Sequence, residues 1–162
     1  SGADRAGEST SRAIPSYPRL ADVMRAIGCS KEDRQELFKR MIFNVICGND
    51  DDHVRNHAVV YDMSQHRWRL SPAYDVVPTQ GDLPSHLAMG VSQLDTRITL
   101  ENVLSGHAEF GFENQIEAKF AALETFDKVS QSYETIKDLL DRARQKMISK
   151  QISEAASKLF GR

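Results

Sequence analysis

The sequence predicts a mainly α-helical domain with one small β-hairpin near its middle. Apolar residues recur every three or four positions over most of the chain, which is typical of helices that bury one face. Two short β-prone runs, residues 58–61 and 67–70, interrupt this pattern. With 162 residues, 40% of them hydrophobic, the chain is long enough to form one compact domain with its own core.

The first sixteen residues are polar and small and follow no repeating pattern. We therefore expect a flexible N-terminal segment over residues 1–16 and the folded domain over residues 17–162. The chain begins Ser-Gly-Ala, without an initiator Met, which favours a fragment of a longer protein over a natural N-terminus.

Two helices are expected before the middle of the chain. The first covers residues 19–27 and ends at Gly28. Its apolar face is predicted at Leu20, Val23, Met24 and Ile27. Ser30 can cap the second helix, because a hydroxyl accepts a hydrogen bond from a free amide of the first turn. Its buried face is predicted at Leu37, Phe38, Met41, Ile42, Val45 and Ile46. Gly48 and Asn49 end this helix, so a rigid element supports the loop that follows.

The two β-prone runs are joined by five residues, 62–66, and predict an antiparallel hairpin. A hairpin carries the chain out and back, so Asn56 before it and Asp75 after it can meet at its base. Trp68 is expected to pack beneath the hairpin rather than to stack on a ligand. Residues 86–91 are a candidate for one more strand.

The pattern after the hairpin is helical again. Thr99 is expected to cap a helix that contains Val103 and Leu104. A second apolar stripe is predicted at Phe112, Ile116, Phe120 and Leu123. A long terminal helix, straight or bent, is predicted from Tyr133, Ile136, Leu140, Ala143, Met147, Ile152, Ala156 and Leu159.

Charge and composition exclude several classes of function. The net charge is -2 and no run of Lys and Arg stands out, so we expect no direct binding to nucleic acid. No stretch approaches the roughly 20 apolar residues of a membrane span, and no signal peptide is visible. We therefore expect a cytoplasmic protein without membrane contact. Its two cysteines, Cys29 and Cys47, favour free thiols over a disulfide.

Three consecutive carboxylates, residues 50–52, are the most unusual local feature. Like charges this close are unfavourable unless a cation or several donors compensate them. The simplest interpretation is a solvated turn, because Asp and Asn are common turn residues. His53 and His57, four positions apart, could instead be half of a zinc site, although no H-E-x-x-H motif is present. A one-metal nuclease site is a further alternative, and it usually has a basic surface.

A phosphotransfer site accounts for more of these residues. Asp51 and Asn56 form a D-x-x-x-x-N element, and Asp75 lies beyond the hairpin. Phosphotransfer enzymes use an Asp to orient the attacking hydroxyl, and an Asn and a second Asp to hold magnesium on the nucleotide phosphates. In this interpretation Asp51 is the catalytic residue, and Asn56 and Asp75 are the metal ligands.

At these residues the sequence resembles the HipA-like serine/threonine kinases, the toxins of bacterial toxin–antitoxin systems. Their catalytic segment reads approximately G-N-x-D-x-H-x-K-N, and residues 48–56 read G-N-D-D-D-H-V-R-N. The family continues with L-x-P-x-Y-D, and residues 70–75 read L-S-P-A-Y-D. The likeness is strongest over residues 37–78. It implies the C-terminal, helical lobe of a protein-kinase-like fold.

The resemblance implies the same roles for the two aspartates and the asparagine, with Mg²⁺ and ATP as cofactors. Asn49 and His53 would hold the loop in shape. Arg55 replaces the Lys that is usual in the family, which keeps the charge and alters its geometry. It is a candidate phosphate contact, or it only balances the charge of the acidic cluster.

The resemblance also implies partners. A kinase needs an upper lobe with a phosphate-covering loop and a Lys, and the residues before Gly48 supply neither. We therefore expect the N-terminal lobe of the same kinase as a partner and no activity of this chain alone. Family precedent adds a DNA-binding antitoxin and a protein substrate such as an aminoacyl-tRNA synthetase. The alternative is a non-catalytic helical interaction module whose acidic loop only caps helices.

Overall fold

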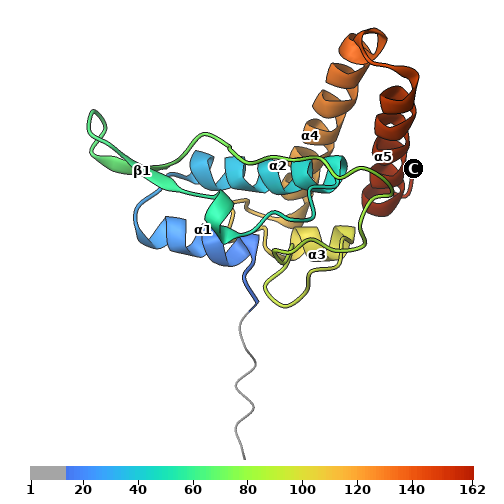
Figure 1. Cartoon of the computed structure of the whole chain (residues 1–162). Helices are drawn as coiled ribbons and strands as arrows, with labels where there is room; N and C mark the ends of the chain where they lie inside the picture. The colour runs from blue at the N-terminus through green and yellow to red at the C-terminus, as the bar shows by residue number, and fades with distance from the viewer. Residues whose placement is uncertain (1–13) are drawn as a thin grey trace, which may run out of the picture.

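A central helix, α2 (Lys31–Cys47), has three other helices packed against it, as Figure 1 shows. The computed structural model describes residues 14–162. The other elements are α1 (Tyr17–Ala26), η1 (Val54–Asn56), β1 (Val59–Asp62), β2 (Arg67–Leu70), α3 (Leu100–Ser105), α4 (Gln115–Ile136), η2 (Lys137–Leu139) and α5 (Arg142–Phe160). Helices α1, α4 and α5 contact α2, and the predicted class, mainly α with one hairpin, is confirmed. Within the described residues, no helix combines the length and the apolar character needed to cross a membrane.

Helix α2 has the buried face that the sequence predicts. Its six predicted core residues are all buried: Leu37, Phe38, Met41, Ile42, Val45 and Ile46. The Ser30 hydroxyl oxygen accepts a hydrogen bond from the Asp33 amide at 3.1 Å and caps the first turn. Gly48 ends the helix in the left-handed conformation, with φ +67°. The first turn, the buried face and the end of α2 could all be predicted from the sequence, because each depends on residues within the helix or directly next to it.

Helix α1 begins two residues earlier than predicted and buries a different face. Ser16 is buried and its hydroxyl oxygen accepts a hydrogen bond from the Arg19 amide at 3.4 Å, so the first turn starts at Tyr17. The buried stripe then comprises Tyr17, Pro18, Ala21 and Met24. The predicted face was wrong at Val23, which is 57% exposed. The large Tyr17 ring sets which side of the helix meets the core. Of the N-terminal segment predicted as flexible, residues 1–13 lie outside the described residues.

The predicted hairpin is confirmed, with strands β1 and β2 paired from Val59 with Leu70 to Asp62 with Arg67. The connection has four residues, 63–66, rather than five. It is ordered by the Asp62 carboxylate, which accepts a hydrogen bond from the Ser64 amide at 2.9 Å. The Arg69 guanidinium lies 2.9 Å from the buried Asp33 carboxylate and ties β2 to the first turn of α2.

Trp68 does not lie beneath the hairpin, and that prediction was wrong. Its ring is partly exposed and meets the Tyr61 ring of the paired strand edge to face, with 5.3 Å between the ring centroids. The two residues are cross-strand partners on one face of a two-stranded sheet, which has no second layer to cover it on that side.

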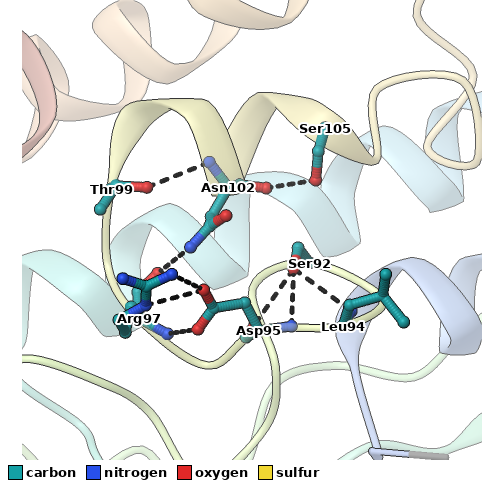
Figure 2. A network of polar contacts seen from close by, with 7 residues as sticks. All are labelled: Ser92, Leu94, Asp95, Arg97, Thr99, Asn102 and Ser105. Carbon is teal, nitrogen blue, oxygen red and sulfur yellow. Dashed lines mark hydrogen bonds and ion pairs between the residues drawn. The ribbon is translucent and has the colours of Figure 1, made fainter.

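The segment between the hairpin and α3 contains no strand at residues 86–91, which corrects the sequence prediction. Two isolated bridges occur instead, Ser16 with Gly90 and His86 with Arg97. Side chains then close the following turn, as Figure 2 shows. The Ser92 hydroxyl oxygen accepts a hydrogen bond from the Asp95 amide at 2.8 Å, and the Asp95 carboxylate accepts one from the Arg97 guanidinium at 2.8 Å. The same network reaches α3, which Thr99 caps as predicted.

Helix α4 packs against α2, and its predicted apolar stripe was wrong at two of four positions, since Phe112 is buried and Leu123 is half-buried. Ile116 and Phe120 are 68% and 67% exposed. The buried residues of α4 are Ala118, Ala122 and Phe126. Two aromatic rings that precede α4, Phe110 and Phe112, already fill the space beside Phe38 of α2, with ring centroids 5.2 and 5.0 Å away. The helix therefore approaches α2 on its alanine side.

The predicted long terminal helix is divided into α4 and α5, which fold back on each other as a helical hairpin (Figure 1). The Asp141 carboxylate accepts a hydrogen bond from the Arg144 amide at 2.8 Å and caps α5. The Tyr133 hydroxyl of α4 donates to the Gln145 carbonyl of α5 at 2.9 Å. Asp141 was not predicted as a capping residue, because the regular apolar spacing continues on both sides of it.

The opposite environments of two phenylalanines give a test of this packing. We expect Phe38→Ala to lower the free energy of unfolding by about 3–5 kcal/mol, because a buried ring leaves a cavity. The same change at the exposed Phe120 should cost less than about 0.5 kcal/mol. Urea denaturation of both variants measures the difference, and equal losses would contradict the assignment of the α4 face.

Candidate functional site

The loop that follows α2, residues 48–57, turns back along α2 and is anchored to it by amide side chains. Asn49 is buried, and its side-chain amide donates to the Asn44 side-chain carbonyl at 3.1 Å. The Asn49 backbone amide donates to the Asn44 backbone carbonyl at 2.9 Å. Asn44 is a buried polar residue next to the apolar face of α2. The start of the loop is thus fixed from within the helix.

The three consecutive aspartates lie in three different environments. The Asp50 carboxylate accepts a hydrogen bond from the Thr79 hydroxyl at 2.8 Å, and its backbone carbonyl accepts one from the Ala88 amide at 2.9 Å. Asp51 is exposed, and no hydrogen bond to its carboxylate is found among residues 14–162. Asp52 is buried. Asp50 and Asp52 therefore have separate hydrogen-bond partners.

Asp52 is held by two donors inside the protein. One carboxylate oxygen, Oδ2, accepts a short hydrogen bond from the Tyr17 hydroxyl and lies 2.8 Å from His57 Nε2. The side chains of Asp52 and His57 are 4% and 5% exposed. Because an ionised carboxylate only accepts hydrogen bonds, His57 Nε2 must carry the proton in this pair. Burial and then the Asp52 charge raise the pKa of Tyr17 well above its usual value, so the phenol remains a donor.

Asn56 and Asp75 meet at the base of the hairpin, as the spacing predicts. The Asn56 side-chain amide donates to the Asp75 carboxylate at 3.2 Å. Asp75 is exposed and has φ +55°, in the left-handed region that residues other than glycine rarely adopt. The Tyr74 hydroxyl adds a second tie, donating to the Arg55 carbonyl at 2.9 Å. Strained backbone of this kind is concentrated at functional sites.

The pair has the chemistry of a magnesium site. Mg²⁺ prefers oxygen ligands and is commonly bound by one or two carboxylates together with phosphates and water. The Asp75 carboxylate and the Asn56 amide oxygen fit that set. Among residues 14–162, no group of three or more His, Cys, Asp and Glu side chains lies close enough to hold a metal ion. His57 Nε2, considered above for zinc, is bonded to Asp52 instead.

A cavity of about 420 Å³ is lined by Asn56 and by Tyr74 and Val76, the two neighbours of Asp75 in the chain. It lies between α2, the loop, residues 73–76 and Thr125 of α4. Its lining includes Lys39, Arg40, Phe43, Asn56, Tyr74 and Val76. Most of the exposed lining is apolar, and the charged side chains that line the cavity include the acidic Glu36 as well as Lys39 and Arg40.

Several residues that shape the site were not assigned to it from the sequence. Tyr17 lies 35 positions from Asp52, and no local pattern connects them. Among residues 14–162, the buried Nδ1 atoms of both His53, which was expected to hold the loop, and His57 have no hydrogen-bond partner, and His57 bonds to Asp52 through Nε2. Arg55 is exposed beside Asn56. The one signal in the sequence is Asn44, a polar residue among the apolar residues near the end of α2.

Both cysteines are free thiols, as predicted for the described part of the chain. Cys29 is buried, and Cys47 is partly buried at the end of α2, next to the loop. Burial raises the pKa of the Cys47 thiol to about 11.

Comparison with known proteins connects these residues to a family. The sequence model of the family described as HipA-like C-terminal domain matches residues 2–159. Among solved structures, the chain is similar to HipA of a Shewanella oneidensis MR-1 toxin–antitoxin system, determined in complex with HipB and operator DNA. The TM-score is 0.62 at 17% sequence identity, over 89% of this chain and 35% of that chain. Comparison with curated proteins gives no significant match.

Two neighbouring aspartates test the assignment of buried and exposed carboxylates. We expect Asp52→Asn to lower the free energy of unfolding by about 1–3 kcal/mol, because the change weakens two buried hydrogen bonds. Asp51→Asn, the matched control one residue away, should change it by less than about 0.5 kcal/mol. Urea denaturation at neutral pH measures both values. Equal stabilities of the two variants would contradict the burial of Asp52.

The Cys47 thiol makes the stability of the fold depend on alkaline pH. The thiol of an unfolded chain has a pKa of about 8.5. Because the folded-state pKa is higher, about 11, its contribution is complete below the unfolded pKa and is lost as the pH rises towards the folded one. We expect the free energy of unfolding to fall over this interval, and to fall less in Cys47→Ala. Urea denaturation at a series of pH values measures the difference, and parallel curves would contradict it.

Proposed function

Because this chain belongs to the family of HipA-like C-terminal domains, we propose that it is the catalytic lobe of a serine/threonine protein kinase. The observation that carries the proposal is the hydrogen bond at the base of the hairpin, 3.2 Å from Asn56 Nδ2 to Asp75 Oδ2. Asn56 belongs to the same loop as the exposed Asp51. Kinases require one Asp for the hydroxyl nucleophile and an Asn and an Asp for magnesium.

Each of the three residues has a role suited to its environment. Asp51, exposed and without a competing partner among the described residues, would orient the substrate hydroxyl and accept its proton. Asn56 and Asp75 would hold Mg²⁺, which when bound compensates the charge of the ATP phosphates. Arg55, exposed beside Asn56, is the candidate for a direct phosphate contact.

The rest of the nucleotide site would come from residues beyond this lobe. The chain spans 35% of the length of the Shewanella HipA chain that it resembles. We propose that an N-terminal lobe covers the phosphates, so that the described lobe alone transfers no phosphate. By analogy with the HipA–HipB–operator complex, a DNA-binding antitoxin is the proposed protein partner. The proposed substrate is a Ser or Thr of a cytoplasmic protein such as an aminoacyl-tRNA synthetase.

Phosphotransfer by the kinase with both lobes tests the proposal. We expect Asp51→Asn to reduce the rate of phosphotransfer from ATP by about 10²–10⁴-fold, the usual contribution of a positioned general base. Asp75→Asn should abolish Mg²⁺-dependent transfer without loss of the folded state. Phosphate incorporation into the protein substrate measures both effects.

Asp82→Asn is the matched control, because Asp82 is an exposed aspartate paired with Lys150 on α5. Its activity should equal that of the unchanged kinase. If Asp51→Asn and Asp75→Asn also keep full activity, the lobe is the non-catalytic interaction module that the sequence left as the alternative. Phosphotransfer by the isolated lobe would contradict the proposed need for a second lobe.

A further inference from the structure

The exposed Asp51 lies between two anchored neighbours. Asp50 is bonded to the segment after the hairpin, through the Thr79 hydroxyl at 2.8 Å and the Ala88 amide at 2.9 Å. Asp52 is bonded to the start of α1 through the Tyr17 hydroxyl. The anchors come from parts of the chain far apart in sequence, and neither involves Asp51. The backbone on both sides of this carboxylate is thus fixed while the carboxylate itself meets solvent.

The two anchors are also tied to each other. The Tyr17 amide donates to the Gly90 carbonyl at 3.0 Å, and the Gly90 amide donates to the Pro15 carbonyl at 2.8 Å. A side chain at residue 90 would not fit, since a Cβ there would lie 2.7 Å from the Ser92 carbonyl oxygen and 3.1 Å from Ser16 Cβ. The loop, α1 and the segment around Gly90 therefore form a closed ring of contacts.

The Tyr17 hydroxyl is the centre of this ring. It donates to Asp52 and accepts a hydrogen bond from the Asn44 side-chain amide at 3.0 Å, and Asn44 in turn accepts one from Asn49. One hydroxyl thus connects α1 to α2, to Asp52 and, through Asn44, to Asn49 just before the three aspartates. The Tyr17 ring also meets the His57 ring edge to face, 5.6 Å between centroids. Removal of the hydroxyl would leave Asp52 with His57 as its remaining donor.

The contacts of Asp52 also affect the position of Asn56. The short helix η1 (Val54–Asn56) lies between Asp52 and His57, whose side chains bond to each other at 2.8 Å. This contact closes the ends of the turn that presents Asn56 to Asp75. A shift of Asp52 would therefore move Asn56 as well as Asp51.

We infer that Tyr17 is a positioning residue of the candidate catalytic loop, acting through Asp52 and His57 on Asp51 and Asn56. The inference rests on the proposed function, because that function is what requires Asp51 and Asn56 to be held in place. It assigns to α1, which carries none of the motif residues, a part in binding the metal.

The test removes one hydroxyl group and measures the loop and the metal pair separately. Tyr17→Phe keeps the buried ring, and Tyr133→Phe is the matched control, because the Tyr133 hydroxyl bonds to Gln145 within the α4–α5 hairpin. Amide hydrogen exchange in the metal-free chain reports on the loop through Asn56 and His57, whose amides bond to His53 and Val54. Mn²⁺ is the probe for the pair, and its Kd comes from paramagnetic broadening of NMR signals near Asn56 and Asp75.

We expect Tyr17→Phe to speed exchange of these two loop amides by about tenfold and to raise the Kd for Mn²⁺ by about tenfold, as the loss of a buried hydrogen bond allows. Tyr133→Phe should change neither value, even where it lowers the melting temperature to a similar extent. If the two variants have the same exchange rates and the same Kd, Tyr17 is a structural residue and the inference is overturned.

Failure of the proposed function would look different. If Mn²⁺ does not bind the unchanged chain near Asn56, or if Asp75→Asn leaves its Kd unchanged, the metal assignment is wrong. The exchange rates of the metal-free chain then still decide whether Tyr17 holds the loop: faster exchange in Tyr17→Phe alone supports that part of the inference, and equal rates overturn it.

Discussion

The buried face of α2 is the constraint on which the rest of the structure depends. Three helices pack against it, and large apolar side chains leave this helix few ways to move. The same helix carries Asn44, buried near its end, which bonds to Asn49 and to the Tyr17 hydroxyl. Core packing and the loop are therefore one mechanical unit. A loop supported in this way can hold its side chains in place without a ligand.

The sequence predicts this structure where local rules decide and fails where tertiary packing decides. The cap at Ser30, the end at Gly48 and the hairpin follow from residues next to them, and so does the meeting of Asn56 with Asp75. The exposed face of α4 does not, because Phe110 and Phe112, which precede the helix, pack on Phe38 of α2 while Phe120 remains exposed. The spacing of apolar residues within α4 does not show which rings from outside the helix pack on α2.

The site divides in the same way. The residues assigned to phosphotransfer belong to two short motifs and could be found from their spacing. The residues that hold the motif are Tyr17, Asn44, Asp52 and His57, and their contacts join segments up to 35 positions apart. Three consecutive aspartates look alike in a sequence, yet one is buried, one is bonded to a neighbouring segment and one is exposed. Burial separates Asp52 from the other two, and the hydrogen bond from Thr79 separates Asp50 from Asp51; only the fold determines either.

The left-handed backbone of Asp75 costs stability at a residue that the proposed function assigns to the metal site. A residue other than glycine in this conformation costs on the order of 1 kcal/mol. Glycine would remove that cost, and asparagine would tolerate the same backbone, but neither supplies a charged carboxylate. In the proposed function, the φ of +55° at Asp75 is the stability that the site gives up in order to place a charged ligand beside Asn56.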